Sequence, residues 1–168
     1  MTVYSPASYN ELIGCLKKSL SFNTPLAIRY PRGKEELPFK FDDSDFTVFA
    51  NGGTIAIVTY GIISSAAVKA LKKLNDDGIN VDVIKLNKIY PVSGKLIETL
   101  KNYDKIYFFE EGIRKGGISE HVVAYGNIKN YRITAIENKF VPSATVSAAR
   151  QKLKLDADSM YKIIKGEN

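Results

Sequence analysis

Residues 29–33, with the sequence R-Y-P-R-G, carry the clearest chemical signal in the chain. Arg29 closes a short apolar run and belongs to a predicted strand, whereas Arg32 follows Pro31, which stops that strand. Pro31 stiffens the turn and Gly33 gives it conformational freedom. A guanidinium held on such a turn can bind a phosphate through two parallel charge-assisted hydrogen bonds. Most surface arginines bind no ligand, so position alone makes Arg32 a candidate and no more.

A second segment of interest, residues 110–117 (E-E-G-I-R-K-G-G), follows a very apolar strand and precedes a predicted helix. Free backbone amides near Gly117 could meet an anion at that helix N terminus. The spacing is neither G-x-G-x-x-G nor that of a Walker loop. Glu110 and Glu111 end a buried strand, and they fit acid–base chemistry and a salt bridge or domain contact about equally well.

The other potentially reactive side chains have no supporting context. His121, the single histidine, lies in a predicted helix with no Cys or second His as a metal partner. Cys15 is the single cysteine, so it forms no internal disulfide and is predicted to be a small buried apolar residue. Ser64, Ser65 and Ser119 lack a nucleophile motif such as G-x-S-x-G. We assign no catalytic, cofactor-binding or metal-binding residue to the chain.

The elements that position these residues begin with a helix. Ser8 and Glu11 form an S-x-x-E capping box, which predicts a helix over residues 8–22. Leucines then recur at every fourth position: Leu12, Leu16 and Leu20. This spacing predicts an apolar stripe that faces a core. A short strand is expected at 26–30, and residues 33–45 have no apolar period and are typical of a connecting segment.

Beyond that segment, strands and helices alternate. We expect strands at 54–59, 80–85, 105–109 and 132–136, and helices at 63–74, 93–100, 118–125, 146–153 and 157–164. Such alternation is typical of an α/β fold with an open, mostly parallel sheet and helices on both faces. We therefore divide the chain into residues 1–40 and residues 41–168.

Composition and charge narrow the function classes. The chain has 168 residues, of which 45% are hydrophobic and 25% charged, as in soluble globular proteins. The net charge is +6, but the lysines are interleaved with acids, which argues against nucleic-acid binding and remains compatible with an anionic small molecule. No apolar run approaches the ~20 residues of a membrane span, and the start has no signal-peptide pattern. We expect a cytoplasmic protein without membrane or nucleic-acid partners.

Several segments resemble the 1-deoxy-D-xylulose-5-phosphate synthases, a transketolase-like family of thiamine-diphosphate enzymes. The R-Y-P-R-G turn is the most specific of them. Others follow the order of the transketolase C-terminal domain or of the synthases' final segment: 53–57 (G-T-I-A-I), Gly61, Pro91, 109–112 (F-E-E-G), 116–117 (G-G), 140–142 (F-V-P) and 153–156 (L-K-L-D). The resemblance covers nearly the whole chain. Residues 1–40 are then similar to the end of a pyrimidine-binding domain, and residues 41–168 to a transketolase C-terminal domain.

The resemblance implies an activity for the complete enzyme, which condenses pyruvate with glyceraldehyde 3-phosphate, releases carbon dioxide and leads to isoprenoid precursors. Thiamine diphosphate with Mg²⁺ supplies the carbanion chemistry in that family. Arg32 matches the family arginine that holds the phosphate of the acceptor aldehyde, and a homo-oligomer, such as a homodimer, is implied as well. The resemblance assigns Arg29 no role beyond its place in the predicted strand.

The family's cofactor residues are missing from this sequence. There is no G-D-G motif with its downstream asparagine, and the glutamate and histidines of the family's active site lie in parts of the enzyme that precede this chain. Met1 aligns with an internal position of the synthases. We therefore expect a chain that binds no cofactor alone, does not turn over alone, and needs an amino-terminal part, fused or separate.

Two alternatives remain open. The glycine loop and the alternating pattern are shared by transketolases and by the beta subunits of 2-oxoacid dehydrogenases, so the chain could be the carboxyl-terminal half of either. It could also be a non-catalytic module that only assembles with partner chains.

Overall fold

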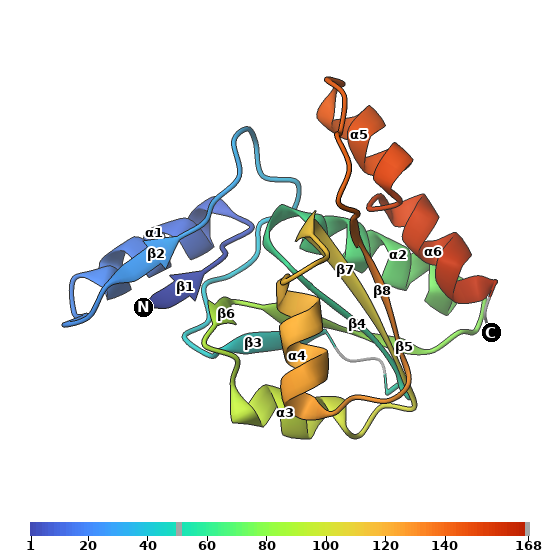
Figure 1. Cartoon of the computed structure of the whole chain (residues 1–168), viewed down its shortest axis with the longest axis horizontal. Coiled ribbons are helices and arrows are strands. Elements are labelled where there is room, and N and C mark those ends of the chain that lie inside the picture. Colours follow the sequence, from blue (N-terminus) through green and yellow to red (C-terminus); the bar gives the residue numbers. More distant parts are fainter. Residues whose placement is uncertain (50–51, 167–168) are drawn as a thin grey trace.

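The computed structural model describes residues 1–49 and 52–166, which form two sheets with helices packed around the larger one (Figure 1). The strands are β1 (Thr2–Tyr4), β2 (Leu26–Ile28), β3 (Phe46–Phe49), β4 (Ile55–Tyr60), β5 (Val81–Leu86), β6 (Lys88–Tyr90), β7 (Lys105–Ile113) and β8 (Tyr131–Ile136). The helices are α1 (Tyr9–Ser19), α2 (Ser64–Asp76), α3 (Gly94–Leu100), α4 (Ile118–Gly126), α5 (Val146–Leu153) and α6 (Ala157–Lys165), and a 3-10 turn, Gly61–Ile63, leads into α2.

The larger sheet has five strands in the order β3-β5-β4-β7-β8. The pairs β5–β4, β4–β7 and β7–β8 are parallel, and β3 is an antiparallel edge strand beside β5. Helices α2 and α6 pack on each other on one face, while α3 and α4 pack on the other (Figure 1). The predicted α/β class, with a mostly parallel sheet between two helical layers, is confirmed.

The strands are apolar on both sides because each sheet face carries its own core. Along β4, Ile57 faces the core of α2 and α6, where it meets Leu74 and Met160. Its neighbour Val58 points the other way, into the core that α3 and α4 cover. This alternation explains why β4 and the first part of β7 read as nearly continuous hydrophobic runs rather than as alternating ones, whereas β5 is buried along its length but includes Asp82 and Lys85.

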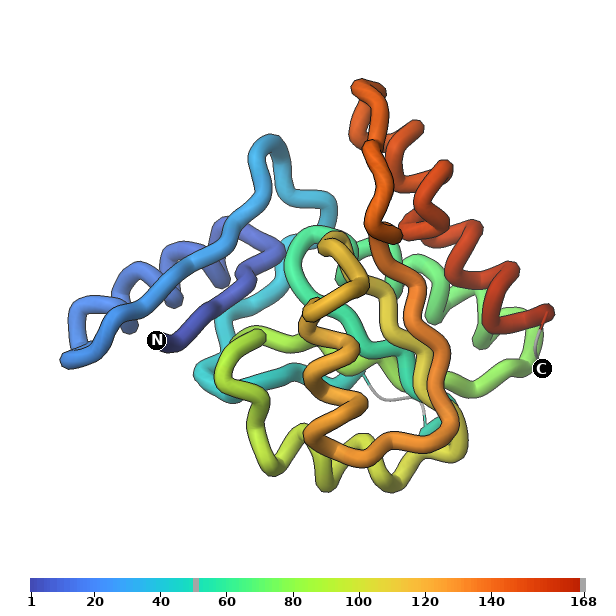
Figure 2. Tube along the Cα trace, viewed as in Figure 1, coloured from blue at the N-terminus to red at the C-terminus, as the bar shows by residue number. Residues whose placement is uncertain are grey.

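A smaller sheet joins the two parts into which the sequence was divided. Strand β1 lies between β2, to which it is parallel, and β6, to which it is antiparallel. Because β6 follows β5 directly, the hydrogen bonds of β1 cross the expected boundary near residue 40. The backbone N–H of Ser5 extends this contact by donating to the carbonyl of Asn87 at 2.9 Å. Figure 2 shows this amino-terminal segment, in blue, to one side of the larger sheet.

Helix α1 corrects one expectation. Ser8 caps it as predicted, and its hydroxyl accepts from the backbone N–H of Glu11 at 3.3 Å. The side chains that α1 buries, however, are those of Glu11 and Cys15, and the helix ends at Ser19 rather than near residue 22. Leu12 is partly buried, but the other large apolar side chains of the stripe are half or more exposed: Ile13 50%, Leu16 52% and Leu20 89%. The prediction that the leucine stripe faces a core is wrong, because the opposite side of α1 is the one that packs on the rest of the chain.

Other differences concern short or extended strands. Strands β1, β3 and β6 were not predicted, and β7 continues to Ile113, four residues beyond its expected end at 109.

Among the described residues, no helix combines the length and the hydropathy that a membrane span requires.

Candidate anion-binding site at the R-Y-P-R-G turn

The turn that carries Arg32 forms one wall of a cavity of about 460 Å³. The opposite wall is the start of α1, including Tyr9 and Leu12. Glu35, two residues after Gly33, lies in the same cavity, where its carboxylate accepts from the backbone N–H of Tyr9 at 2.8 Å. The turn is therefore held against α1 by a contact that does not use Arg32.

Arg32 itself is exposed at the cavity wall. Within the described part of the chain it makes no hydrogen bond and no ion pair, so its guanidinium is not committed to holding the fold. Gly33 has φ of 106°, a conformation that favours glycine, and a Cβ there would meet nothing within 4 Å. Gly33 is thus required by the backbone turn rather than by close packing. The structure places Arg32 where a ligand can reach it, and its phosphate role stays a prediction.

Arg29 has a different task. It lies just after β2, and its guanidinium donates to the hydroxyl of Tyr60 at 3.3 Å and to the carbonyl of Glu111 at 2.6 Å. Its side chain also lies over the Tyr60 ring, 5.5 Å from the centroid. Arg29 therefore ties the R-Y-P-R-G segment to the ends of β4 and β7. A second cavity, of about 180 Å³, lies here and shares Tyr30 and Pro31 with the first.

Glu110 is the buried anchor of this region. Its carboxylate accepts from the Tyr60 hydroxyl at 2.7 Å and from the backbone N–H groups of Ile118 at 2.9 Å and Ser119 at 3.0 Å. The Ser119 hydroxyl adds a fourth bond, at 2.6 Å. The helix N terminus predicted to meet an anion thus meets the chain's own carboxylate, and its amides are not free for a ligand. Of the two readings of the paired glutamates, the structural contact is the one that these bonds support.

Tyr60 was not recognised in the sequence, although it is central to the network. Burial and the neighbouring Glu110 carboxylate raise the pKa of Tyr60 well above its ordinary value of 10.0. The hydroxyl therefore stays protonated and donates to Glu110, while it accepts from Arg29. The sequence did offer a signal, because Tyr60 and Glu110 come directly after the expected strands at 54–59 and 105–109. Polar groups that follow neighbouring parallel strands meet at one edge of a sheet.

Glu111 begins a second network, which reaches α5. Arg150 binds Glu111 at 3.3 Å through Nε and Glu36 at 2.7 Å through Nη1. Lys69 on α2 binds the same Glu36 carboxylate at 2.8 Å. The connecting segment after R-Y-P-R-G is therefore held to α2 and α5 by ion pairs. No local sequence pattern predicts them.

Glu36 gives this network a pH dependence. Burial would raise the pKa of its carboxyl, but the ion pairs with Lys69 and Arg150 outweigh it and hold the pKa below the ordinary value of 4.5. A carboxyl whose pKa is lower in the folded state stabilises the fold above its unfolded pKa, and this contribution is lost as pH falls through the folded pKa. Because Glu36 is partly exposed, the contribution is under about 1 kcal/mol.

We expect Glu36→Gln to lose less stability than the parent between about pH 6 and pH 3, because the titrating group is gone. Urea unfolding at each pH measures the difference. Glu98→Gln, at an exposed position on α3, is the matched control and should follow the parent. Parallel curves for Glu36→Gln and the parent would contradict the assignment.

The remaining candidates do not line the cavity beside Arg32. His121 is exposed, and its ring stacks on Tyr125 at 6.3 Å between centroids. Cys15 is buried. Ser119 serves Glu110, whereas the hydroxyls of Ser64 and Ser65 are buried without a hydrogen-bond partner among the described residues. No three His, Cys, Asp or Glu side chains within residues 1–49 and 52–166 gather as metal ligands would.

The sequence of the chain is similar to those of known transketolase-type proteins. The sequence matches the family described as transketolase, C-terminal domain, over residues 47–160. The 1-deoxy-D-xylulose-5-phosphate synthase of Clostridium kluyveri (strain NBRC 12016) is 32% identical, and the match covers 98% of this chain and 28% of that protein. The synthase of Shouchella clausii (strain KSM-K16) is 30% identical over 92% of this chain and 27% of its own length. The chain thus spans little more than a quarter of these relatives.

Two solved structures have the same fold. A protein described as a split gene transketolase, inactive beta4 tetramer, superposes with a TM-score of 0.82 at 22% identity, covering 99% of this chain and 57% of that one. Transketolase from Campylobacter jejuni subsp. jejuni NCTC 11168 superposes with a TM-score of 0.75 at 13% identity, covering 98% of this chain and 26% of that one. At these identities the likeness is one of fold.

Proposed function

Because the chain belongs to the transketolase C-terminal domain family, we propose that it is the carboxyl-terminal portion of a 1-deoxy-D-xylulose-5-phosphate synthase. The complete enzyme would condense pyruvate with glyceraldehyde 3-phosphate and release carbon dioxide, for isoprenoid precursor synthesis in the cytoplasm. One observation carries this proposal: the similarity to the Clostridium kluyveri synthase covers 98% of the chain, and so includes the R-Y-P-R-G turn upstream of the family match at 47–160.

In this proposal Arg32 binds the phosphate of the acceptor aldehyde. Its guanidinium is exposed at a cavity wall and makes no ion pair within the described residues, so it can pair with a dianion. A phosphate fixed there would orient the aldehyde carbonyl toward the reacting carbon, which lowers the entropic part of the barrier. The ion pair of Glu36 with Arg150 and the bonds of Arg29 keep the turn in place on either side.

The residues of this chain do not fit a thiamine-diphosphate site. The sequence contains no G-D-G motif, and no three His, Cys, Asp or Glu side chains of the described residues gather as metal ligands would. The cofactor, which would supply the carbanion chemistry, would be held by another polypeptide or another part of the same one. We accordingly assign this chain substrate binding and subunit contact, and no chemical step.

The exposed face of α1 supports a contact with that missing part. Tyr9, Ile13, Leu16 and Leu20 are each at least half exposed on this helix or its end. A row of large apolar side chains on one helix face is typical of a surface that another polypeptide covers. We propose that the assembled enzyme is a homo-oligomer of both parts.

The partner could be a separate chain. The split gene transketolase, described as an inactive beta4 tetramer, has this fold over 99% of our chain. By analogy, the present chain would be inactive by itself and would gain activity with an amino-terminal polypeptide. The carboxyl-terminal half of a transketolase or of a 2-oxoacid dehydrogenase beta subunit, and a non-catalytic assembly module, are the competing readings.

Mixing the chain with the candidate amino-terminal polypeptide tests the proposal. We expect pyruvate decarboxylation that requires both chains, thiamine diphosphate and glyceraldehyde 3-phosphate. Use of ketose phosphate donors in place of pyruvate would point to a transketolase, and complex formation without turnover would point to an assembly module.

In the assembled enzyme, we expect Arg32→Ala to raise KM for glyceraldehyde 3-phosphate by about 10- to 100-fold, the effect of losing one or two charge-assisted hydrogen bonds. KM for pyruvate should change little, because pyruvate has no phosphate. Steady-state kinetics with each substrate varied in turn measures the split.

Lys34→Ala is the matched control, since Lys34 is also exposed, carries the same charge and does not line the cavity. Arg32→Lys should restore part of the affinity, because a lysine keeps the charge but not the bidentate geometry. Equal effects of Arg32→Ala on both substrates would rule out the role assigned to this residue.

A further inference from the structure

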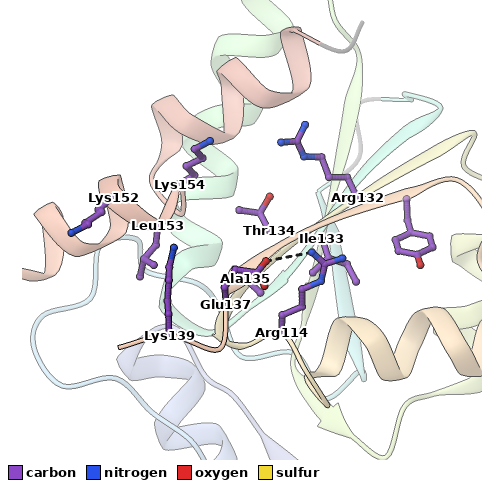
Figure 3. Close-up of a pocket in the computed structure, with 11 residues that line it drawn as sticks. Arg114, Arg132, Ile133, Thr134, Ala135, Glu137, Lys139, Lys152, Leu153 and Lys154 are labelled. Carbon is purple, nitrogen blue, oxygen red and sulfur yellow. Dashed lines mark hydrogen bonds and ion pairs between the residues drawn. The ribbon is translucent and has the colours of Figure 1, made fainter. Parts of the chain in front are cut away.

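A basic cavity lies beside β8, an edge strand of the larger sheet, and shares no lining residue with the cavity beside Arg32 (Figure 3). It has a volume of about 530 Å³ and is bounded by strand β8 on one side and by the end of α5 on the other. Strand β8 is the last strand of the sheet, so one of its backbone edges is not covered by another strand of that sheet.

Positive charge is concentrated around this cavity. Five of the side chains that line it are cationic: Arg114, Arg132, Lys139, Lys152 and Lys154. One is acidic, Glu137, and it is paired with Arg114 at 3.4 Å. The whole chain has 24 basic residues against 18 acidic ones, so a ratio of five to one marks a local excess. Lys139, Lys152 and Lys154 form no ion pair with any other described residue.

The side-chain alternation of β8 turns polar groups toward the cavity. Ile133 and Ala135 are buried in the core that α3 and α4 cover. Arg132 and Thr134 alternate with them along the strand and lie beside the α5–α6 connection at Lys154, as Figure 3 shows. The cavity therefore combines an ordered strand as its floor with lysines at its rim.

The rim is also fixed by backbone structure. Lys154 ends α5 with φ of 60°, a left-handed conformation, and its backbone N–H donates to the carbonyl of Gln151 at 3.1 Å. Arg132 and Lys154 also line an adjoining cavity of about 370 Å³, which includes Lys162 on α6. The cationic surface thus continues from Arg114 to α6 along β8.

From this geometry we infer that the cavity beside β8 binds a small molecule that carries at least two phosphate groups. Several cations set around one concave space suit a ligand whose negative charges are spread over neighbouring phosphates, because each phosphate can then pair with a different cation. A volume of about 530 Å³ is in the range of small-ligand pockets. The inference does not depend on the synthase proposal, because its test measures ligand binding and requires no enzymatic activity.

Titration calorimetry of the chain with inorganic pyrophosphate and with orthophosphate, in low-salt buffer, provides the test. We expect saturable binding of pyrophosphate with one site per chain and an affinity at least about tenfold above that for orthophosphate. Equal affinities, or no saturable pyrophosphate binding, would overturn the inference.

A pair of double variants locates the site. Lys152→Gln with Lys154→Gly removes two cations from the rim, and glycine suits the positive φ at position 154. Pyrophosphate affinity should fall by at least about tenfold, which corresponds to the loss of roughly one charge-assisted hydrogen bond. Lys95→Gln with Lys101→Gln, on exposed positions of α3 and its end, changes the net charge equally and should leave binding within about twofold of the parent. Equal losses in both double variants would show attraction to overall charge and no site.

Discussion

Replacing Lys85 with methionine is expected to lower the free energy of unfolding by about 3–5 kcal/mol, because it leaves a buried carboxylate without its counter-charge. Lys85 on β5 and Glu11 on α1 pair at 2.6 Å, with side chains only 1% and 6% exposed. Burial lowers the pKa of Lys85, and the Glu11 carboxylate opposes that shift. The ammonium also donates to Asn87 at 2.7 Å. This ion pair links α1 to the larger sheet.

The control is a double-mutant cycle. Glu11→Gln alone should destabilise as well, whereas Lys85→Met combined with Glu11→Gln should cost clearly less than the sum of the two single changes. Urea unfolding gives the free energies. Cys15, the single cysteine, is buried beside this pair, so its alkylation rate reports whether α1 has detached. Additive losses, with no faster alkylation, would show that the two residues do not act as a pair.

Removing the Glu110 carboxylate should cost about 3–4 kcal/mol, since Glu110→Ala leaves two backbone amides and two hydroxyls without their acceptor. The closeness of Gly117 shows how tightly this carboxylate is held. A Cβ at Gly117 would lie 2.9 Å from both Glu110 carboxylate oxygens and 2.7 Å from the carbonyl oxygen of Ile113. Thermal unfolding monitored by circular dichroism measures the loss.

Tyr60→Phe is the matched comparison, because it removes one of the four donors and keeps the ring. It should cost about 1 kcal/mol, the usual contribution of a single neutral hydrogen bond, or somewhat more. A loss as large as that of Glu110→Ala would mean that the tyrosine, and not the carboxylate, organises the start of α4.

Most of the larger sheet could be predicted because its elements bury long apolar patterns. The expected strand at 54–59 is β4 at Ile55–Tyr60, and the expected helices at 146–153 and 157–164 match α5 and α6 to within one residue. Strands β1, β3 and β6 have three or four residues each, too short for any period to show. They form through pairing with segments far away in the chain, which local sequence does not report.

The error at α1 has a physical cause. Periodicity shows that a helix has an apolar face, but not what covers that face. The buried side of α1 is the one that carries Glu11. Lys85, which is 74 positions further along the chain, neutralises the charge of this carboxylate. A capping-box glutamate was visible in the sequence, yet its lysine partner lay within an apolar strand with nothing to single it out.

The candidate site was predicted in part. Arg32 could be singled out because proline and glycine flank it, and the structure places it at a cavity wall. The anchoring of the turn, through Tyr60, Glu110 and Arg150, depends on contacts between distant elements. The basic cavity beside β8 was invisible for the same reason, since its cations come from separate segments and each resembles an ordinary surface residue.

The three-stranded sheet has a consequence for building chimeras. Strand β1 hydrogen-bonds to β6, so residues 1–40 bring with them both a strand and the acid of the buried ion pair. A relative that receives residues 1–40 of this chain must supply a lysine at the position of Lys85 and a compatible backbone at the positions of residues 88–90. A chimera joined within residues 33–45 can therefore fail although the junction itself is well chosen. Its stability depends on the β1–β6 pairing and on the Glu11–Lys85 ion pair, and both lie outside the junction.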